Sequence, residues 1–420
     1  MSRERATAAP AAWLPRRALV LGVARSGQAA ALALARRGVE VVAADRSPDA
    51  DAGRLAAAGV ELRLGTEEES VVEGVELVVK SPGVPAESPL VTVARARAIP
   101  IWSEVELGYR LLQGNPLIGV TGTNGKTTTT ELLAAILRAG GKSAEVAGNV
   151  GRALTDVAER IDPGVTVVCE LSSFQLEDVH TLECDVAVLL NLEPDHLDRH
   201  GTFEAYRDAK LRIFERARTK IVPRGSGLVG IEFAADDPLP AEPQMPGLHN
   251  RENAAAATAA ARAVGVGDEA IAAALRTFPG VPHRLELVRE LRGVRYVNDS
   301  KATNTAAARR GVSAYDAPIR LILGGSLKGE DFGPFARDLP ANVASIYLIG
   351  EASDELATAL DAAGCSYARD GDLAHAVEHA AADAEPGDVV LLSPAAASFD
   401  QFDDFEHRGD AFRGVVQELA

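Results

Sequence analysis

Short apolar runs alternate along the chain with longer segments in which apolar residues recur at helical spacing. The run ALVLG (18–22) is followed by the helical pattern QAAALALARRG (28–38) and by a second run, VEVVAAD (39–45). Apolar runs bounded by turn residues are typical of strands that are buried on both faces, as in a parallel sheet. The start of the chain therefore predicts a strand–helix–strand unit.

The same alternation continues to the C-terminus, with Ala-rich helical patterns between the apolar runs. Strands that alternate with helices imply parallel sheets covered by helices on both faces. A chain of 420 residues is also too long for one ordinary domain. We therefore predict three consecutive α/β domains, at 1–112, 113–280 and 281–420. Further strands are predicted at 76–85, 115–120, 165–170, 186–191, 220–223, 295–298, 319–325, 345–350 and 388–393.

The composition excludes several classes of partner. The net charge of −17 argues against binding to nucleic acid or to an anionic membrane, since both favour proteins rich in Lys and Arg. The three cysteines form no C-x-x-C motif, so neither a disulfide framework nor a zinc knuckle is expected. No stretch approaches the ~20 uninterrupted apolar residues of a membrane span. We expect a cytoplasmic protein without membrane insertion.

The stretch GVTGTNGKTTTTE joins a predicted buried strand to a predicted helix. It differs from the strict phosphate-loop pattern, because Val120 stands where the first glycine would be. Gly122 and Gly125 still allow the backbone to wrap a phosphate at the helix N-terminus, where free N–H groups and the helix dipole favour an anion. Lys126 supplies a positive charge and Thr127 a hydroxyl for Mg²⁺. The sequence therefore predicts a shorter loop with the function of a phosphate loop.

Chemically active residues also follow three other predicted strands. Glu170 and Ser172 follow one strand, Asp195 and His196 follow the next, and Asp299 follows a strand near residue 298. Ligands of open parallel sheets bind at the carboxyl ends of the strands. A buried carboxylate such as Glu170 is costly unless it is paired or bound to a metal, and Mg²⁺ prefers hard oxygen ligands. These clusters predict a nucleotide and Mg²⁺ site.

The first strand–helix–strand unit is suited to a different nucleotide. Gly22 and Gly27 lie in its turn, and Asp45 ends its second strand at about the ~20-residue spacing from which an acidic group reaches a ribose. Ala24 replaces the middle glycine of the G-x-G-x-x-G pattern, which disfavours close approach of a dinucleotide. We therefore discount NAD as its ligand.

Taken together and in order, TGTNGKTT, ELSSFQLE, NLEPDHLDRH, LHNRENAAAA, PHRLE and NDSKATN resemble the Mur ligase family over about residues 18–413. Within that family, NDSKATN, LGGSLKGEDF and SPAAASFDQFDDFEHRGDAF are similar to the branch that adds D-glutamate. The resemblance implies a UDP-binding Rossmann-like domain, a central P-loop ATPase-type domain and a C-terminal Rossmann-like domain that binds the amino acid. It implies an ATP-dependent ligase that activates UDP-N-acetylmuramoyl-L-alanine as an acyl phosphate and joins it to D-glutamate. ATP, two Mg²⁺ ions and a monomeric protein are expected.

The resemblance also implies roles for single residues. The catalytic residues are expected to be Lys126, His196 and Lys210. ATP is expected to contact Gly122, Thr123, Asn124, Gly125, Lys126, Thr127, Thr128, Asn253, Arg284 and Asp299, flanked by His249, Asn250 and His283. The UDP substrate is expected to contact Arg25, Ser26, Asp45, Arg46, Ser81, Asn149, Ser172 and His196. D-glutamate is expected to contact Lys301, Thr303, Lys328, Ser398, Phe399 and Phe405. The metal is expected to contact Thr127, Glu170, His196 and Lys210, the last as a carbamate formed with CO₂.

Simpler readings of several of these residues stay open. Lys210 is, by its pattern alone, a solvated helix lysine, and Asn250 and Asn253 could cap the Ala-rich helix that follows. Phe405 could belong to a core. Arg25 stands where the family usually has an apolar residue, so it could contact the UDP phosphates or lie on the surface.

Three other functions are weighed against the ligase. The first is another Mur or folylpolyglutamate-type ligase with a different amino acid, which the C-terminal motifs disfavour. The second is a nucleotide-binding oxidoreductase, which Ala24 and the lack of a recognisable hydride-transfer site disfavour. The third is an ATP-dependent switch without catalysis, which would not need LGGSLKG or SPAAASFDQF.

Overall fold

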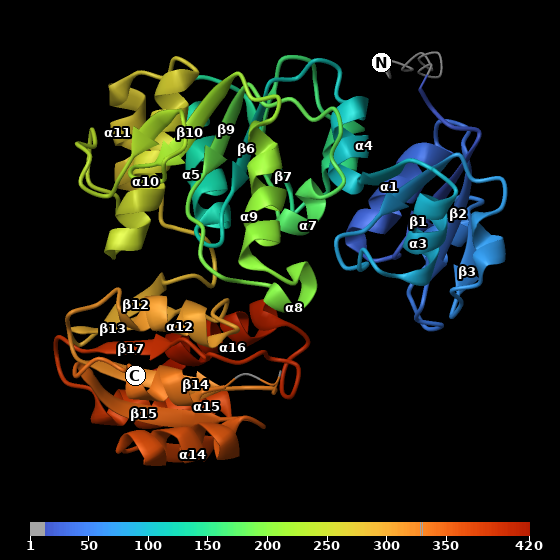
Figure 1. The fold of residues 1–420 in the computed structure, drawn as a ribbon. Coiled ribbons are helices and arrows are strands. Elements are labelled where there is room, and N and C mark those ends of the chain that lie inside the picture. Colours follow the sequence, from blue (N-terminus) through green and yellow to red (C-terminus); the bar gives the residue numbers. More distant parts are fainter. Residues whose placement is uncertain (1–12, 328, 330) are drawn as a thin grey trace, which may run out of the picture. The chain divides into compact units, whose positions relative to one another are not determined.

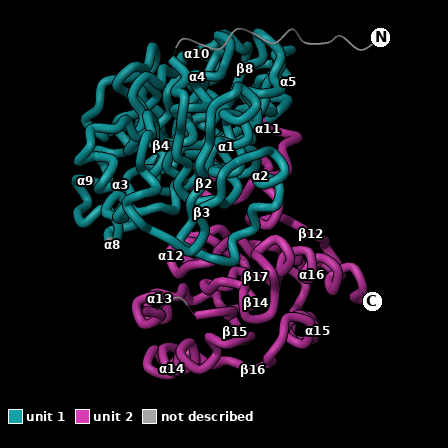
Figure 2. The backbone as a smooth tube through the Cα atoms, turned by 90° about the vertical axis from the view of Figure 1, so that its right-hand side faces the viewer, with its two compact units in different colours: residues 1–241, 252–274 teal, residues 242–251, 275–420 magenta. Residues whose placement is uncertain are grey.

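The computed structural model describes residues 13–327, 329 and 331–420 (Figure 1). Contacts between Cα atoms group the chain into two compact units, which Figure 2 shows in different colours. Unit 1 comprises residues 1–241 and 252–274, and unit 2 comprises residues 242–251 and 275–420. Unit 1 contains two sheets and unit 2 contains one. The three-domain α/β organisation is confirmed, while the exact domain boundaries stay a prediction.

The first sheet of unit 1 is parallel throughout, in the order β3-β2-β1-β4-β5. Its strands are β1 (Arg17–Leu21), β2 (Glu40–Asp45), β3 (Glu61–Leu64), β4 (Leu77–Lys80) and β5 (Ile101–Ser103). Its helices are α1 (Arg25–Ala35), α2 (Gly53–Ala57), η1 (Glu69–Val72), α3 (Pro89–Ala96) and α4 (Glu104–Leu111).

The central strands of this sheet form because their side chains are buried apolar residues, as the sequence pattern predicts. Helix α1 lies directly against the turn after β1. A Cβ atom on Gly27 would clash with the carbonyl oxygen of Gly22, so only glycine allows this packing. The turn thus brings the N-terminus of α1 next to the carboxyl ends of the strands.

The second sheet of unit 1 is also parallel, in the order β11-β10-β9-β6-β8-β7. Its strands are β6 (Leu117–Thr121), β7 (Ala144–Gly148), β8 (Thr166–Glu170), β9 (Val186–Leu189), β10 (Thr219–Pro223) and β11 (Ile231–Phe233). The helices of this segment are α5 (Lys126–Ala139), α6 (Leu154–Ala158), α7 (Ser173–Leu176), α8 (Leu197–His200), α9 (Phe203–Leu211), η2 (Arg212–Phe214), α10 (Leu248–Ala263) and α11 (Asp268–Thr277). The unit boundary runs through α10 and α11.

Two charged side chains, Lys80 and Arg199, connect the first sheet to the second within unit 1. The buried ammonium of Lys80, at the end of β4, lies 2.7 Å from a carboxylate oxygen of Asp178 and 3.1 Å from one of Glu177. Arg199 donates hydrogen bonds to the backbone carbonyls of Pro82 (2.6 Å) and Val84 (2.8 Å). Because a buried charge that loses its partner is costly, these contacts fix how the loop after β4 lies in unit 1.

Unit 2 contains the sheet β12-β13-β17-β14-β15-β16. Its strands are β12 (Glu286–Leu291), β13 (Val294–Asn298), β14 (Ile319–Gly324), β15 (Val343–Ile349), β16 (Ala368–Gly371) and β17 (Val389–Leu392). Its helices are α12 (Thr305–Val312), α13 (Gly333–Arg337), α14 (Ser353–Ala363), α15 (Leu373–Asp383) and α16 (Phe405–Glu418). The prediction of purely parallel sheets is wrong at one edge, because β12 pairs with β13 in the antiparallel sense through the short Arg292–Gly293 turn.

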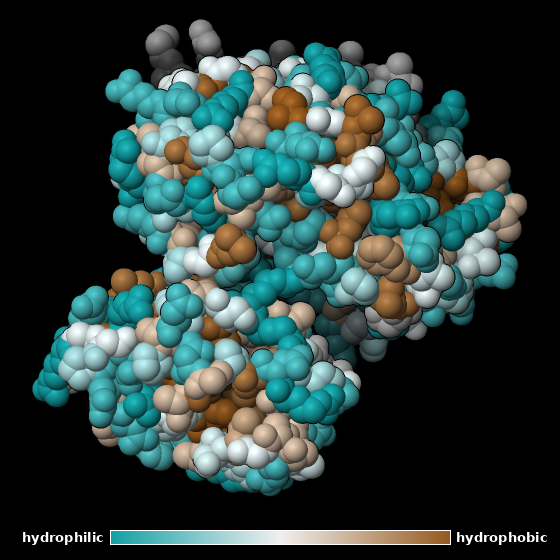
Figure 3. Space-filling model, turned by 60° about the vertical axis from the view of Figure 1, so that its left-hand side comes forward, coloured by the Kyte–Doolittle hydropathy of each residue, from teal (hydrophilic) through white to brown (hydrophobic). Residues whose placement is uncertain are grey.

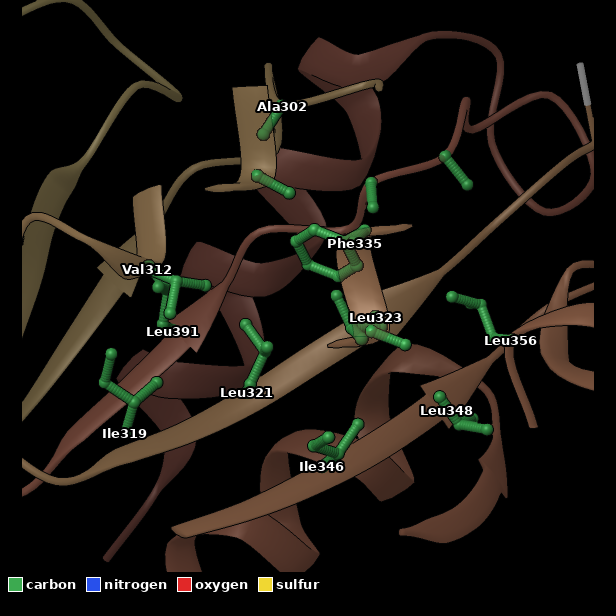
Figure 4. Close-up of a cluster of buried hydrophobic side chains, with 14 of the residues drawn as sticks. Ala302, Val312, Ile319, Leu321, Leu323, Phe335, Ile346, Leu348, Leu356 and Leu391 are labelled. Carbon is green, nitrogen blue, oxygen red and sulfur yellow. The ribbon is translucent and has the colours of Figure 1, made fainter. Parts of the chain in front are cut away.

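One face of this sheet carries a well-filled core (Figure 4). Ile319, Leu321 and Leu323 of β14 point to the same side because side chains alternate along a strand. Leu348 of β15 and Phe335 of α13 pack against them. This core holds the carboxyl ends of β13, β14 and β17 in register for the loops that follow.

Most of the surface in Figure 3 is hydrophilic, with apolar residues scattered among polar ones. The exposed large apolar residues include Val229 (90% exposed), Leu248 (74%) and Phe399 (68%). Among the described residues, no helix is both long and apolar enough to span a membrane.

Candidate active site

The loop after β6 has the geometry of an anion-binding turn. Gly125 is the N-cap of α5 with φ +82°, a left-handed conformation that favours glycine. The cap makes no side-chain hydrogen bond, and the first turn of α5 contains no acidic residue, so its N–H groups face no competing anion there. A Cβ atom on Gly125 would clash with the side chain of Asn253. Asn253 is therefore in close contact with the loop, and it lies inside α10 rather than at its N-cap. Its contact with ATP stays a prediction.

Hydrogen bonds from Lys126 and to Asn191, which follows β9, stabilise this loop. The Lys126 ammonium donates to the carbonyl oxygens of Gly122 and Thr123, both at 2.9 Å. The backbone N–H of Asn124 donates to the side-chain oxygen of Asn191 at 2.8 Å. These contacts hold the Lys126 ammonium against the backbone of the loop that is predicted to bind phosphate.

Lys210, near the end of α9, reaches the same loop. Its amine is buried (2% exposed) and donates to the carbonyl oxygen of Gly122 at 2.8 Å. Burial, followed by repulsion from the Lys126 ammonium, lowers the pKa of Lys210 to about 6, while Asp195 and Glu170 act in the opposite direction. The reading of Lys210 as a solvated helix lysine is wrong. Two lysine amines converge on one carbonyl oxygen at the start of α5.

The expected metal ligands provide hard oxygen donors near the loop. Glu170 ends β8, is 2% exposed, and accepts a hydrogen bond from the side-chain amide of Asn149 at 3.1 Å. The Thr127 hydroxyl lies in the first turn of α5. Among the described residues there is no group of three or more His, Cys, Asp and Glu side chains spaced to hold a metal. A carboxylate and a hydroxyl next to a phosphate site fit Mg²⁺, which keeps few protein ligands and completes its shell with phosphate and water.

His196 differs from the other expected ligands, because its side chain is half exposed. It is the N-cap of α8, with φ +51°, and its ring packs against Phe174 at 4.9 Å between centroids. A left-handed backbone is uncommon for residues other than glycine, although histidine adopts it more readily than most. Its role in metal or substrate binding stays a prediction.

A cavity of about 640 Å³ opens at the carboxyl end of the first sheet. Asp45 is anchored there, because its carboxylate accepts hydrogen bonds from the N–H groups of Val23 and Ser47, both at 2.9 Å. The volume and the mixed polar lining are those of a site for a nucleotide-sized ligand. The structure thus brings most of the residues expected to contact the UDP substrate to one cavity. Those that line it are Arg25, Ser26, Asp45, Arg46, Ser81 and Asn149.

Ser172 and His196 are not among the residues that line this cavity. The Ser172 hydroxyl accepts a hydrogen bond from the N–H of Gln175 at 3.2 Å and so forms the N-cap of α7. Its local role is therefore structural, as expected for a serine at that position. The assignment of both residues to the UDP substrate stays a prediction.

Unit 2 contains the remaining residues expected to contact ATP. Asp299 is buried after β13 and accepts hydrogen bonds from the Ser393 hydroxyl (2.7 Å) and the N–H of Leu285 (3.3 Å). Burial raises the pKa of Asp299 to about 7, and Arg284 opposes the shift. His249 lies near the same arginine, and burial followed by repulsion from Arg284 lowers its pKa to about 4.

Other predicted residues of unit 2 flank this group. Asn250 lies inside α10 and is not its N-cap residue. Its side-chain amide donates a hydrogen bond to the carbonyl oxygen of Pro246 at 2.7 Å. The ring nitrogen Nδ1 of His283 lies 3.1 Å from the side-chain amide nitrogen of Asn298, the residue that precedes Asp299.

The residues expected to bind D-glutamate lie on loops after β13 and β17. The Lys301 ammonium is 5.5 Å from the centre of the Phe405 ring, and Ser398 is buried (2% exposed). Phe399 is largely exposed, and its N–H donates to the Ser326 hydroxyl at 3.1 Å. Thr303 follows Lys301 on the same loop, with its N–H bonded to the Lys301 carbonyl. Lys328 lies outside the described residues.

Two residues without a predicted role support loops of the candidate site, one in each unit. Arg408 of α16 is fully buried and donates to the carbonyls of Ala396 and Ala397 and to the hydroxyl of Ser300, which holds the SPAAAS segment in place. Burial lowers the pKa of Arg408 to about 10. In unit 1, the Tyr206 hydroxyl lies 2.9 Å from the Thr123 hydroxyl of the loop after β6. Arg408 lies in the segment SPAAASFDQFDDFEHRGDAF, but only the tertiary structure shows what its side chain contacts.

Three family models match the chain. Residues 16–103 match the Mur ligase MurD-like N-terminal domain, residues 120–226 the Mur ligase middle domain, and residues 283–396 the Mur ligase glutamate ligase domain. A UDP-N-acetylmuramoylalanine–D-glutamate ligase of Pelotomaculum thermopropionicum is 40% identical over 454 residues, with 96% of this chain and 98% of the relative covered. A relative of the same name from Anaeromyxobacter dehalogenans is 41% identical over 458 residues, with the same coverage.

Solved structures share the fold at lower identity. The UDP-N-acetylmuramate–alanine ligase of Thermotoga maritima has a TM-score of 0.61 at 19% identity, covering 96% of this chain and 99% of that one. The MurF ligase of the same organism, in complex with ADP, has a TM-score of 0.59 at 17% identity, covering 91% and 96%. FolC of E. coli, in complex with DHPP and ADP, has a TM-score of 0.55 at 20% identity, covering 75% and 92%.

Proposed function

The chain belongs to the Mur ligase family, and on this basis we propose how its residues divide the work of the reaction. The chain is a ligase that uses ATP to join D-glutamate to UDP-N-acetylmuramoyl-L-alanine in peptidoglycan synthesis. The observation that carries the proposal is the convergence of Lys126 and Lys210 on the Gly122 carbonyl at the N-terminus of α5. The oxidoreductase and switch alternatives are dropped, because the full-length relatives are named as ligases.

The reaction has two bond-forming steps. A carboxylate oxygen of the muramoyl-alanine substrate attacks the γ-phosphorus of ATP, and ADP leaves. The amine nitrogen of D-glutamate then attacks the acyl carbon, phosphate leaves with the activating oxygen, and the nitrogen loses a proton. In the first step, negative charge gathers on the transferring phosphoryl oxygens. Lys126 and the N–H groups at the start of α5 compensate this charge and orient the β- and γ-phosphates.

Magnesium dependence is general to the ATP-using ligases of this family. When bound, Mg²⁺ neutralises the phosphate oxygens and fixes their orientation. We propose that Thr127 and Glu170 would hold Mg²⁺ at the phosphate site and that His196 would supply a ligand for a second ion. The Asn149 amide keeps one oxygen of Glu170 in place, which leaves the other free for a ligand.

We also propose that Lys210 acts as a carbamate. Its amine nitrogen attacks the carbon of CO₂, a C–N bond forms, and one proton is released, so that the buried amine becomes an anion with two hard oxygens. The described residues offer Lys210 no carboxylate within ion-pair distance, and its hydrogen bond goes to a neutral carbonyl. A buried ammonium without an ion partner is costly in free energy. The negative charge of a carbamate would instead be compensated by the Lys126 ammonium and by a bound metal.

The cavity at the first sheet is proposed to bind the UDP part of the substrate. In the Asp45→Ala variant, the Kd for UDP-N-acetylmuramoyl-L-alanine should rise roughly ten- to a hundredfold, since hydrogen bonds to a charged group are worth about 1.5–3 kcal/mol. The reason is that the Asp45 carboxylate lines the cavity and fixes the backbone at Val23 and Ser47. Calorimetry with each nucleotide alone measures this. Glu73→Ala, which changes an exposed acid of the same unit, is the control, and a loss of ATP affinity in Asp45→Ala would contradict the assignment.

The amino-acid site is proposed to lie around Lys301, Ser398 and Phe405. Phosphate release with UDP-N-acetylmuramoyl-L-alanine and ATP should depend on D-glutamate, with L-glutamate, L-lysine and meso-diaminopimelate near background. A cation and a hydroxyl on separate loops suit the two carboxylates of one small amino acid. Comparable turnover with L-lysine would contradict this site. An NADH absorbance assay run in parallel should show no change.

The protein is proposed to work in the cytoplasm, a reducing compartment in which cysteines stay as thiols. Cys169, Cys184 and Cys365 are free, and the first two are buried.

A further inference from the structure

Unit 1 contains a second large cavity, beside the one at the first sheet. Its volume is about 520 Å³, and it lies between α1 and α2 on one side and the segment around α6 on the other. Guanidinium groups dominate its charged lining. The arginines that line it are Arg25, Arg36, Arg54, Arg152 and Arg160, and the acids are Asp156 and Glu159.

The two carboxylates of the lining cannot neutralise these five arginines, because each carboxylate is shared. Arg152 also lies 3.5 Å from a carboxylate oxygen of Glu145, which is outside the lining. Asp156 lies 3.5 Å from a guanidinium nitrogen of Arg152 and 3.2 Å from one of Arg160. Glu159 pairs with Arg36 at 3.4 Å and also with Arg37, which is outside the lining. The cavity therefore has a local excess of positive charge in a protein whose net charge is −17.

Two of the arginines are not engaged with any carboxylate among the described residues. Arg54 of α2 is exposed, and no hydrogen bond or ion pair joins its side chain to the described part of the chain. Arg25 donates to the carbonyl oxygen of Gly151 at 2.8 Å, which still leaves guanidinium donors for another acceptor. Like charges gathered around one cavity repel one another, and a bound anion would lower that repulsion.

We propose that this cavity, called the arginine cavity below, binds a small molecule that carries two or more phosphate groups. The planar fork of arginine matches phosphate oxygens in bidentate fashion, and arginine is the preferred side chain for such recognition. The volume lies within the range of cavities that hold small ligands.

The arginine cavity is distinct from the cavity proposed for the UDP substrate. The two share only Arg25 and Ala153 in their linings, while Arg36, Arg54 and Arg160 belong to the arginine cavity alone. Its walls come from helices of the first sheet and from the segment 151–160 of the second. A bound polyphosphate would therefore link the two halves of unit 1 next to the substrate cavity.

Calorimetric titration of the full chain with inorganic tripolyphosphate tests the proposal. The titration is done at low ionic strength, without divalent metal and with UDP-N-acetylmuramoyl-L-alanine saturating, so that the substrate cavity is occupied. The double variant Arg54→Gln/Arg160→Gln should bind tripolyphosphate at least about tenfold more weakly than wild type. The affinity of the wild-type protein should fall as salt is added, because exposed charges are screened.

Two further variants separate the arginine cavity from other anion sites. Arg97→Gln/Arg218→Gln also removes two exposed arginines of unit 1 but none of the cavity, and it should bind like wild type. Lys126→Ala should keep the tripolyphosphate site that the double variant loses. Equal affinities for the double variant and its control, loss of binding in Lys126→Ala, or no binding by wild type would each overturn the proposal. Thermal unfolding of all variants verifies that they are folded.

Discussion

In the Lys126→Ala variant, kcat should fall by about 10³-fold or more, which corresponds to about 4 kcal/mol in the activation barrier. The ammonium of Lys126 lies on the Gly122 and Thr123 carbonyls at the start of α5, where the phosphates of ATP are expected. Its charge compensates negative charge that increases as the phosphoryl group is transferred, so the loss should appear mainly in kcat. Phosphate release at saturating ATP and substrates measures the effect.

Lys142→Ala is the matched control, since Lys142 is an exposed lysine in the loop after α5 of the same unit. It should have wild-type kcat and the same thermal unfolding midpoint as the Lys126 variant. The hydrogen bonds from Lys126 to Gly122 and Thr123 go to loop carbonyls that water can also bind, so removal of the ammonium should leave the fold intact. Activity of Lys126→Ala within about tenfold of wild type would show that this loop is not the phosphate site.

The apolar pattern predicts the interior of each sheet but not its edges. The strands in the middle of the sheets, such as β4, β8 and β17, are continuous apolar runs because both faces and both neighbours bury them. The strands that the pattern misses are β3, β5, β7, β11, β12 and β16, and these are the edge strands of the three sheets. The alternating exposure of β16 and the mainly exposed β11 show why, since an edge strand needs few apolar residues and its sequence resembles that of a loop.

The candidate site also contains residues that the sequence predicts and residues whose contacts it does not predict. Gly122, Gly125 and Lys126 are predictable because a short stretch of sequence contains both the turn and its charge. The contact of Asn253 with Gly125 joins residues far apart in sequence, so it is visible only in the fold. The same holds for Arg408, whose partners are backbone carbonyls that any residue type would supply.

Lys210 is the residue for which the sequence pattern alone is most misleading. The segment AYRDAKLRIF has the composition of an exposed helix, yet Lys210 is buried beside Gly122 and over the Tyr206 ring, 4.7 Å from its centre. Its assignment came from the family resemblance, and the burial adds a physical reason for it. A charged amine at this position would face Lys126 across one carbonyl oxygen, and this repulsion favours the neutral amine that can react with CO₂.

In the Lys210→Arg variant, kcat should fall at least about a hundredfold, about 2.7 kcal/mol, because a guanidinium keeps the positive charge but cannot form the carbamate. If the carbamate oxygens are needed, short carboxylic acids should partly restore activity in Lys210→Ala, which leaves space for them. They should not restore it in Lys210→Arg. Lys220→Arg is the control, since Lys220 also contacts an aromatic ring in unit 1 but not the loop after β6, and it should keep wild-type activity.

A spectroscopic measurement separates the carbamate from a purely structural role of Lys210. Wild-type protein equilibrated with ¹³C-labelled bicarbonate should give a carbamate carbon signal in NMR that both Lys210 variants lack and that Lys220→Arg retains. Depletion of bicarbonate should lower wild-type activity, and its return should restore it, because carbamate formation is reversible. A Lys210→Arg variant that is folded and nearly as active as wild type, or a wild-type spectrum without the signal, would leave Lys210 as a buried lysine that only supports the Gly122 carbonyl.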